Sequence, residues 1–216
     1  MKLQVDSIEK HFGNHKILSD IYLSCEKGEV VGILGRNGCG KTTLLEIIFG
    51  SLKAENKFVK VGTKIIKAIS DNKNLIHLLP QQSFLPRHIS IENLINVFCD
   101  NENAQVLLEN RLIKPHLKAK FSQLSGGELR LIEILMVIYS DCKFAILDEP
   151  FASLSPKFID IVKDEILKSR KDKGIILTDH NYKNVMTISD KIYLIKDSAT
   201  KIIKSEEDLR FFGYLK

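Results

Sequence analysis

The sequence lacks the features of a secreted or membrane-spanning chain. Residues 1–6 contain none of the apolar core of a signal peptide, and no apolar run approaches the roughly 20 residues that a membrane-spanning helix needs. Internal repeats and low-complexity segments are also absent. We therefore expect a soluble, cytoplasmic protein, unless a partner holds it at a membrane.

Cysteine is scarce, and its spacing argues against a metal site or a redox pair. The cysteines are Cys25, Cys39, Cys99 and Cys142. They form no Cys-x-x-Cys pair, and no metal-ligand pattern surrounds them. In an intracellular chain they are most simply reduced thiols.

Charge of either sign is too evenly spread to indicate a nucleic-acid partner. The formal net charge is +5 at pH 7, and the lysines lie along the whole chain rather than in blocks. A solvated surface explains them best, and a basic patch facing anionic lipid headgroups is the weaker alternative. With 216 residues, of which 44% are hydrophobic, the chain can bury a sizeable core as a single domain at 1–216.

A phosphate-binding loop is present at residues 35–42, which fit the pattern G-x-x-x-x-G-K-[ST]. An apolar run of strand length precedes it at 29–34, and residues 42–49 follow with apolar residues at helical spacing up to Gly50. Strand, glycine-rich loop and helix form the context that this motif requires. The glycines let backbone N–H groups curl around an anion, and the helix directs its positive dipole end at the same phosphates.

Individual positions of this loop have expected roles. Lys41 would bridge the β- and γ-phosphates, and Thr42 would supply a hydroxyl ligand to Mg²⁺. Cys39 occupies a variable position, where a small side chain that fills the loop is a simpler interpretation than a redox switch. The loop residues expected to bind nucleotide are Gly35, Asn37, Gly38, Cys39, Gly40, Lys41, Thr42 and Thr43.

Carboxylates and a histidine follow two further apolar strands. The run at 144–147 delivers Asp148 and Glu149 to its carboxyl end, where ligands bind in open α/β sheets. Asp148 would hold Mg²⁺, largely through water, and Glu149 would polarise the attacking water. The run at 174–178 leads to His180, which would sense the γ-phosphate, although a lone histidine is more often structural.

Two glycines and a serine at 124–128 open a strongly apolar helix that extends to residue 139. Ser125 can cap this helix while the exposed N–H groups form an anion site, and a capped helix start without a ligand is the alternative. Elsewhere, strands are expected at 2–8, 17–23, 57–61, 63–67, 75–80 and 188–195, with a hairpin and a helix after the last. A helix capped by Ser90 is expected at 89–95. Residues 100–120 are expected to contain helical pieces and to form the least structured part of a small helical subdomain.

The order of these motifs resembles that of ATP-binding cassette (ABC) ATPases over essentially the whole chain. The matching pieces are Walker A at 35–42, a Q-loop at Pro80 and Gln81, LSGGE at 124–128, ILDEP at 146–150 and TDH at 178–180. LSGG is the discriminating piece, because most P-loop enzymes lack it. The resemblance implies an α/β fold: a P-loop NTPase core with a mostly parallel sheet flanked by helices, an antiparallel β-subdomain, and a small helical subdomain at about 85–140.

The resemblance also implies two ATP molecules, with Mg²⁺, sandwiched in a head-to-tail dimer with a second cassette. One subunit would supply Walker A, the catalytic residues Glu149, His180 and Gln81, and the Mg²⁺ ligands Thr42, Gln81 and Asp148. The other would supply the signature residues Ser125, Gly126, Gly127 and Glu128. An aromatic at about Phe12 stacks on adenine in this family, whereas a core or turn phenylalanine is the alternative.

The finer likeness is to the cassettes for lipopolysaccharide export and branched-chain amino acids, from residues 79–87, 132–134 and 148–152. It implies an ATPase subunit at the cytoplasmic face of a membrane, driving separate membrane subunits that select the cargo. Phe84, Arg87 and Ile89 are candidates for that contact, with ordinary loop packing as the alternative. A soluble ABC ATPase for iron–sulfur assembly, translation or DNA maintenance is the rival. The chain departs from the usual pattern of the family at two places. The D-loop ends in Ser155 instead of aspartate, which puts communication between the two ATP sites in doubt. The signature helix usually carries several arginines, but here it keeps only Arg130 and is unusually aliphatic.

Overall fold

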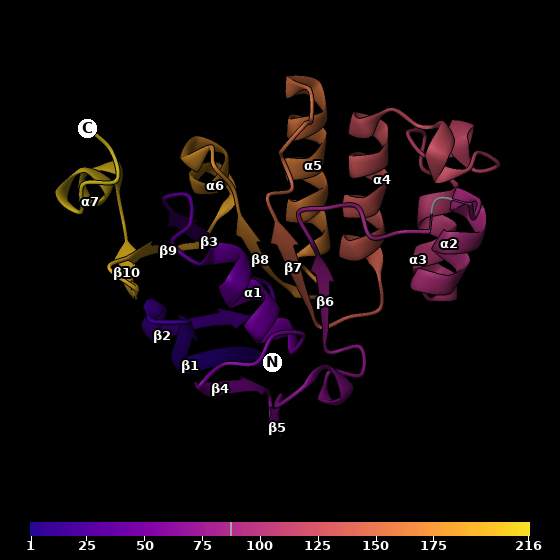
Figure 1. Cartoon of the computed structure of the whole chain (residues 1–216). Helices are drawn as coiled ribbons and strands as arrows, with labels where there is room; N and C mark the ends of the chain where they lie inside the picture. The colour runs from indigo at the N-terminus through magenta and orange to yellow at the C-terminus, as the bar shows by residue number, and fades with distance from the viewer. Residues whose placement is uncertain (87) are drawn as a thin grey trace.

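Ten strands form one mixed sheet in the computed structural model, which describes residues 1–86 and 88–216 (Figure 1). The strand order is β5-β4-β1-β2-β10-β9-β3-β8-β7-β6. The strands are β1 (Lys2–Phe12), β2 (His15–Glu26), β3 (Val30–Gly35), β4 (Asn56–Val61), β5 (Lys64–Ile65), β6 (Ile76–Leu79), β7 (Phe144–Asp148), β8 (Gly174–Thr178), β9 (Lys191–Lys196) and β10 (Ala199–Ile203).

Five neighbouring strands, β9, β3, β8, β7 and β6, are parallel and form the centre of the molecule. Every residue of β3, β7 and β8 is buried, because helices or strands cover both faces of this part of the sheet. Since parallel strands end at the same edge, Gly35, Asp148 and Thr178 reach one edge together, and Asp148 lies directly opposite Thr178 in the register.

Strands β1, β2, β4 and β5 form the expected antiparallel part of the sheet. β1 pairs with β2 and β4, β4 pairs with β5, and β10 joins this layer to the parallel strands by pairing with β2 and β9. β1 continues to Phe12, beyond the predicted end at residue 8, because bulges around Ser7 (φ 51°) absorb the break in its alternating pattern. The α/β fold class predicted from the sequence is confirmed.

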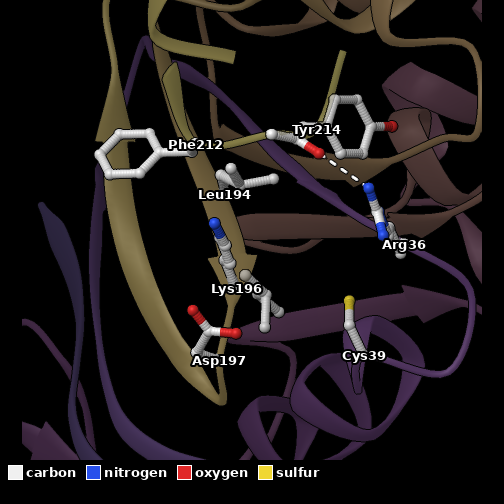
Figure 2. Close-up of a pocket in the computed structure, with 9 residues that line it drawn as sticks. Arg36, Cys39, Leu194, Lys196, Asp197, Phe212 and Tyr214 are labelled. Carbon is white, nitrogen blue, oxygen red and sulfur yellow. Dashed lines mark hydrogen bonds between the residues drawn. The ribbon is translucent and has the colours of Figure 1, made fainter. Parts of the chain in front are cut away.

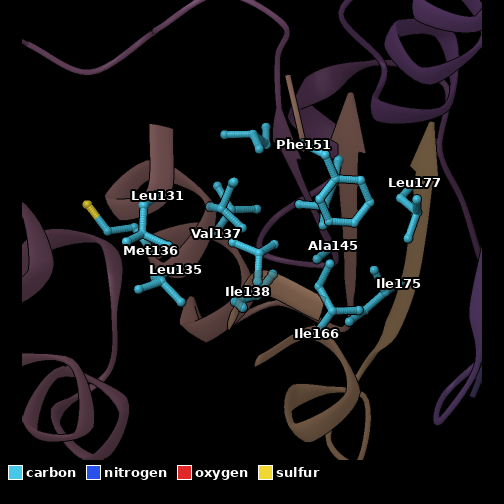
Figure 3. Packing of buried hydrophobic residues seen from close by; sticks show 14 of the residues in the cluster. Leu131, Leu135, Met136, Val137, Ile138, Ala145, Phe151, Ile166, Ile175 and Leu177 are labelled. Atoms are coloured by element: carbon cyan, nitrogen blue, oxygen red, sulfur yellow. The ribbon is translucent and has the colours of Figure 1, made fainter. Parts of the chain in front are cut away.

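Helices cover the two faces of the parallel strands with two hydrophobic clusters. α1 packs with Val31, Ile33 and Ile176 on one face, while α4, α5 and α6 pack with Val30 and Leu177 on the other. Figure 3 shows part of the second cluster, where Ile138 of α4 and Ile166 of α5 lie beside Ile175 of β8. Successive residues of a strand point to opposite faces, so one strand serves both clusters. The helices are α1 (Lys41–Phe49), α2 (Ile91–Phe98), α3 (Asn101–Leu108), α4 (Gly126–Tyr139), α5 (Pro156–Ser169), α6 (Tyr182–Ile188) and α7 (Glu206–Phe211), with short 3₁₀ turns at Ile69–Asp71, Lys114–His116 and Phe121–Gln123.

The helical pieces expected within residues 100–120 include the regular helix α3, which Asp100 caps by accepting the N–H of Asn103 at 2.8 Å. Two sequence predictions about strands need correction. β9 begins at Lys191 rather than at residue 188, since Ile188 ends α6. The strand expected at 63–67 is reduced to Lys64–Ile65. The aliphatic character of the signature helix follows from its position, because α4 lies between the sheet and the pair α2 and α3 (Figure 1) and is buried on almost every side.

Candidate nucleotide site

The glycine-rich loop connects β3 to α1 through backbone conformations that only glycine adopts easily. Gly38 has φ 78° and Gly40, the N-cap of α1, has φ 101°. A Cβ on Gly40 would lie 2.7 Å from the Cγ2 of Ile17, so the loop also packs closely on β2. The loop therefore turns sharply and directs the N-terminus of α1 toward the space beside it.

A cavity of about 400 Å³ lies beside this loop. Residues from five parts of the sequence line it, and they lie at the carboxyl ends of β3, β6, β7 and β8 or in the β1–β2 hairpin. They are Phe12, Ile17, Asn37, Gly38, Gly40, Lys41, Thr42, Thr43, Gln81, Glu149 and His180. The structure thus gathers most of the residues that the motifs predicted into one pocket.

Lys41 holds the loop in its curved shape. Its side chain is buried, and its Nζ donates hydrogen bonds to the carbonyl oxygens of Gly35 at 2.8 Å and Arg36 at 3.4 Å. An ammonium group in this position presents a positive charge to the pocket without a carboxylate partner within the described part of the chain. Its donors can be redirected to an anion in the pocket.

Glu149 is the centre of a short polar chain in the wall of the pocket. Its Oε2 accepts a hydrogen bond from Nε2 of Gln81 at 2.9 Å, and its Oε1 lies 2.7 Å from Nε2 of His180. The backbone of Glu149 has φ 50°, a conformation that costs energy for a residue with a side chain. The backbone N–H of Glu149 donates to Oγ1 of Thr178 at 3.1 Å, which helps to hold this conformation.

Asp148 lies beneath the pocket rather than in its wall. Its side chain is buried, and Oδ1 accepts the hydroxyl of Thr178 at 2.7 Å. Asp148 therefore does not itself line the pocket, and its expected action on Mg²⁺ through water stays a prediction. The hydroxyl of Thr178 thus bonds the side chain of Asp148 and the backbone N–H of Glu149. The sequence analysis had assigned Thr178 no role of its own.

The signature residues lie outside the pocket, at the exposed N-terminus of α4. Ser125 caps the helix: its Oγ accepts the N–H of Glu128 at 3.3 Å and donates to Oε2 of Glu128 at 2.7 Å. The hydrogen bonds from Ser125 lower the pKa of the Glu128 carboxyl. Gly126 is exposed and Gly127 is partly exposed. This capping box confirms the predicted helix start and leaves the end of α4 open to another molecule.

Comparison with known proteins decides the family. A family model described as ABC transporter matches residues 18–152, more than half of the chain. The chain is 30% identical to the lipopolysaccharide export system ATP-binding protein LptB of Haemophilus influenzae, over 93% of this chain and 88% of that protein. It is 28% identical to LptB of Escherichia coli K12, over 97% of this chain and 96% of that protein. The chain belongs to the ABC transporter family.

Solved structures of this ABC family share the fold. An ATP-binding subunit of an ABC transporter superposes with a TM-score of 0.83 at 19% identity, covering 99% of this chain and 94% of the other. A nucleotide-free ATP-binding cassette superposes with a TM-score of 0.82 at 24% identity, covering 98% and 95%. The protein is thus an ATP-binding P-loop ATPase of the transporter-driving class, and the assignment favours this function over a soluble ABC ATPase.

Arg36 and Cys39 belong to the Walker A loop of this ABC ATPase, but they line a different cavity from the nucleotide pocket. The side chain of Cys39 lines a second cavity of about 240 Å³ behind the loop, between Arg36, the end of β9 and Tyr214 (Figure 2). A Cβ on Gly35 would lie 2.4 Å from the Cys39 Sγ, so the thiol fills the space behind the strand end. Burial raises the pKa of the Cys39 thiol, and the nearby Lys41 opposes that shift. Arg36 Nη2 also donates to the Gly213 carbonyl at 2.8 Å, which ties the C-terminal segment to the loop.

Arg130 and Asp179 are structural parts of the site that sequence reasoning left without a role. Arg130 on α4 donates hydrogen bonds to the backbone carbonyls of Pro80, Asp148 and Glu149. Asp179 accepts the N–H groups of Phe151 at 3.2 Å and Asn181 at 2.8 Å, which joins the D-loop to the segment that carries His180. Burial raises the pKa of the Asp179 carboxyl, against the lowering effect of these hydrogen bonds. Asp179 belongs to the TDH motif, which could have identified it.

The candidate contacts for a membrane partner lie between β6 and α2. Phe84 is partly exposed and its ring packs edge-on against Phe98 with centroids 5.9 Å apart. Ile89 is half-buried against the core, and Arg87 lies outside the described residues. Ser155, the D-loop departure, caps α5 by accepting the N–H of Phe158 at 3.4 Å.

Proposed function

We propose that this pocket hydrolyses ATP with Glu149 as the group that activates water. The observation that carries the proposal is the position of the Glu149 carboxylate, held between Gln81 and His180 in the same pocket as the phosphate-binding loop. A general base must lie within hydrogen-bond reach of the proton that it removes. Glu149 lines the pocket, and each of its carboxylate oxygens contacts another residue of the pocket lining, Gln81 or His180.

Binding of ATP would use the loop, Lys41 and Phe12. The N–H groups at the start of α1 and the ammonium of Lys41 would bind the phosphates, with Lys41 exchanging its loop carbonyl partners for phosphate oxygens. Phe12 lines the pocket and is 50% exposed, so one face of its ring is available to a planar adenine ring. Lys10 Nζ lies over the Phe12 ring, 5.2 Å from its centroid, and pairs with Glu55 at 3.2 Å, so it supports the ring from one side.

The pocket also fits Mg²⁺, because the polar atoms nearest the phosphate-binding loop include oxygen donors. The hydroxyl of Thr42 and the amide of Gln81 line the cavity, and the buried carboxylate of Asp148 lies beneath it. Hard oxygen ligands and retained water are what Mg²⁺ prefers. When bound, the ion would neutralise charge that develops on the β- and γ-phosphate oxygens. Thr178, by donating to Asp148, keeps that carboxylate oriented.

A second copy of the chain, or a related cassette, would complete each site. The pocket contains no signature residue, while the exposed end of α4 presents Ser125 and Gly127 outside it. A head-to-tail dimer would bring the two together around ATP. The Glu149→Gln variant should form dimers in ATP and remain monomeric without it, as measured by light scattering after gel filtration. ATP-independent dimers, or monomers at saturating ATP, would contradict this arrangement.

We further propose that the protein acts at the cytoplasmic face of a membrane, through membrane subunits that contact the Q-loop region. None of the helices in the described part of the chain is long and apolar enough to cross a bilayer. The relatives named for lipopolysaccharide export match over nearly the whole chain, which supports a role in a complex of that general kind. Co-purification from detergent-extracted membranes should recover a polytopic membrane protein in stoichiometric amount, and a purely cytosolic set of partners would overturn the proposal.

Purified protein tests the catalytic proposal directly. ATP turnover with Mg²⁺ should fall by about 100-fold or more in Glu149→Gln, because general base catalysis typically contributes that much. Glu207→Gln, which removes an exposed carboxylate on α7, is the matched control and should leave turnover unchanged. Equal turnover in the two variants would remove Glu149 from the proposed role.

A further inference from the structure

A fully buried carboxylate on α4 has no place in the proposed chemistry, which makes it the most informative group outside the pocket. Glu133 has no exposed surface, and its Oε2 has no hydrogen-bond partner among the described residues. An ion pair with Nη1 of Arg130 at 3.6 Å partly compensates its charge. Burying a carboxylate is costly unless it is paired and hydrogen-bonded, so its contacts need an explanation.

The other oxygen of Glu133 reaches the Q-loop. Oε1 accepts the hydroxyl of Ser83 at 2.5 Å, the shortest type of hydrogen bond expected between a hydroxyl and a carboxylate. Ser83 lies two positions after Gln81 in an exposed stretch, 81–84, so this hydrogen bond joins an exposed loop to a fully buried carboxylate. This contact fixes the chain on the C-terminal side of Gln81 to α4.

Arg130 fixes the chain on the N-terminal side of Gln81. Its Nη1 donates to the carbonyl of Pro80 at 2.8 Å, immediately before Gln81, and its Nη2 donates to the carbonyls of Asp148 at 2.7 Å and Glu149 at 3.2 Å. Burial lowers the pKa of the guanidinium, and the carboxylate of Glu133 is the main group that opposes the shift. The arginine therefore fastens the ends of β6 and β7 to the same helix that carries Glu133.

We propose that Glu133 and Ser83 are positioning residues that hold Gln81 against Glu149. Gln81 lies between two anchors, Pro80 through Arg130 and Ser83 through Glu133. Both anchors belong to α4, so the 2.9 Å contact between Gln81 Nε2 and Glu149 Oε2 is set from this helix. The proposal rests on the role given above to Gln81 and Glu149, and it deepens that role by naming what orients them.

The variants that test this are Ser83→Ala, Ser83→Thr and Glu133→Gln, each made in the wild type and in Gln81→Ala. Ser83→Ala should lower kcat for ATP about three- to tenfold, as expected for one ordinary hydrogen bond, with KM nearly unchanged. Ser83→Thr keeps the hydroxyl and should restore kcat. Glu133→Gln should also lower kcat, because the neutral amide no longer pairs with Arg130. Ser51→Ala is the matched control, since that exposed serine bonds only the far end of α1.

The decisive comparison is the double-mutant cycle. If Ser83 acts through Gln81, then Ser83→Ala should cause little further loss of kcat in the Gln81→Ala background. The same fold-loss in both backgrounds would overturn the proposal, whereas loss of turnover in Glu149→Gln alone tests only the proposed function.

A readout independent of turnover is the side-chain amide signal of Gln81 in ¹⁵N–¹H NMR spectra of the full chain. In Ser83→Ala it should move toward the position of a free glutamine amide. An amide signal identical to that of the wild type would overturn the positioning role even in a preparation that does not turn over ATP.

Discussion

Replacing Arg130 by methionine removes the donor that fastens two strand ends to α4. Arg130 is 6% exposed and donates to three backbone carbonyls, and its loss leaves the carboxylate of fully buried Glu133 without its ion-pair partner. Removing one partner of a buried ion pair typically costs about 3–5 kcal/mol. In a domain of this size each kcal/mol lowers Tm by about 2–4 °C, so scanning calorimetry at neutral pH should show a fall of about 6–20 °C.

The double variant Arg130→Met/Glu133→Leu separates charge burial from loss of the carbonyl contacts. Hydrophobic residues of similar volume often replace a buried ion pair at little cost, so the double variant should regain at least half of the lost Tm. Its ATP turnover should stay low, because the carbonyls of Pro80 and Glu149 still lack the donor. A Tm loss in the double variant that equals the sum of the losses in the two single variants would refute the ion pair.

Three further predictions concern the pocket and its surroundings. Gly40→Ala should abolish ATP binding measured by calorimetry, because φ is 101° and the new Cβ would lie 2.7 Å from the side chain of Ile17. Gly28→Ala, at φ 95° with open space around it, is the control that should bind ATP normally. Phe12→Ala should weaken ATP binding about tenfold and Phe12→Trp should preserve it, as expected for base stacking, while the exposed Phe211→Ala changes nothing. Equal affinities in the two Phe12 variants would contradict stacking. Burial raises the pKa of Asp179 above its unfolded value near 3.8, so its contribution to stability is full below that pH and falls as pH rises through the folded pKa. The Tm advantage of the wild type over Asp179→Asn should therefore narrow as the pH rises above about 4, and a widening advantage would refute this sign.

The strands that carry chemistry could be predicted from the sequence because they are buried on both faces. β3, β7 and β8 appear as short, wholly apolar runs, and their motifs mark the edge at which they end. α5 and α6 were not predicted, since few of their residues are buried and no chemical motif lies within them. For α5 a signal existed: Ser155 followed by Pro156 is a common helix start, and both residues occupy those positions.

In the site, the motifs predicted the pocket walls but not how the walls are held. Lys41, Gln81, Glu149 and His180 line one cavity as their motifs indicated. The outward direction of Cys39 depends on how the loop packs against β9 and the C-terminal segment, which no local pattern encodes. The same holds for the buried network of Arg130 and Glu133, because its Q-loop partners Pro80 and Ser83 lie fifty residues away along the chain.

Complementation between two inactive variants tests the composite ATP site most directly. Lys41→Ala disables the loop of its own chain, and Ser125→Arg disables only the group offered to the partner. In a head-to-tail dimer of one variant with the other, one site keeps both the intact Lys41 and the intact Ser125. Mixing equal amounts before adding ATP should restore about a quarter of wild-type turnover, since about half of the dimers are mixed and each has one intact site. Turnover that stays at the level of the separate variants would contradict a site shared between two chains.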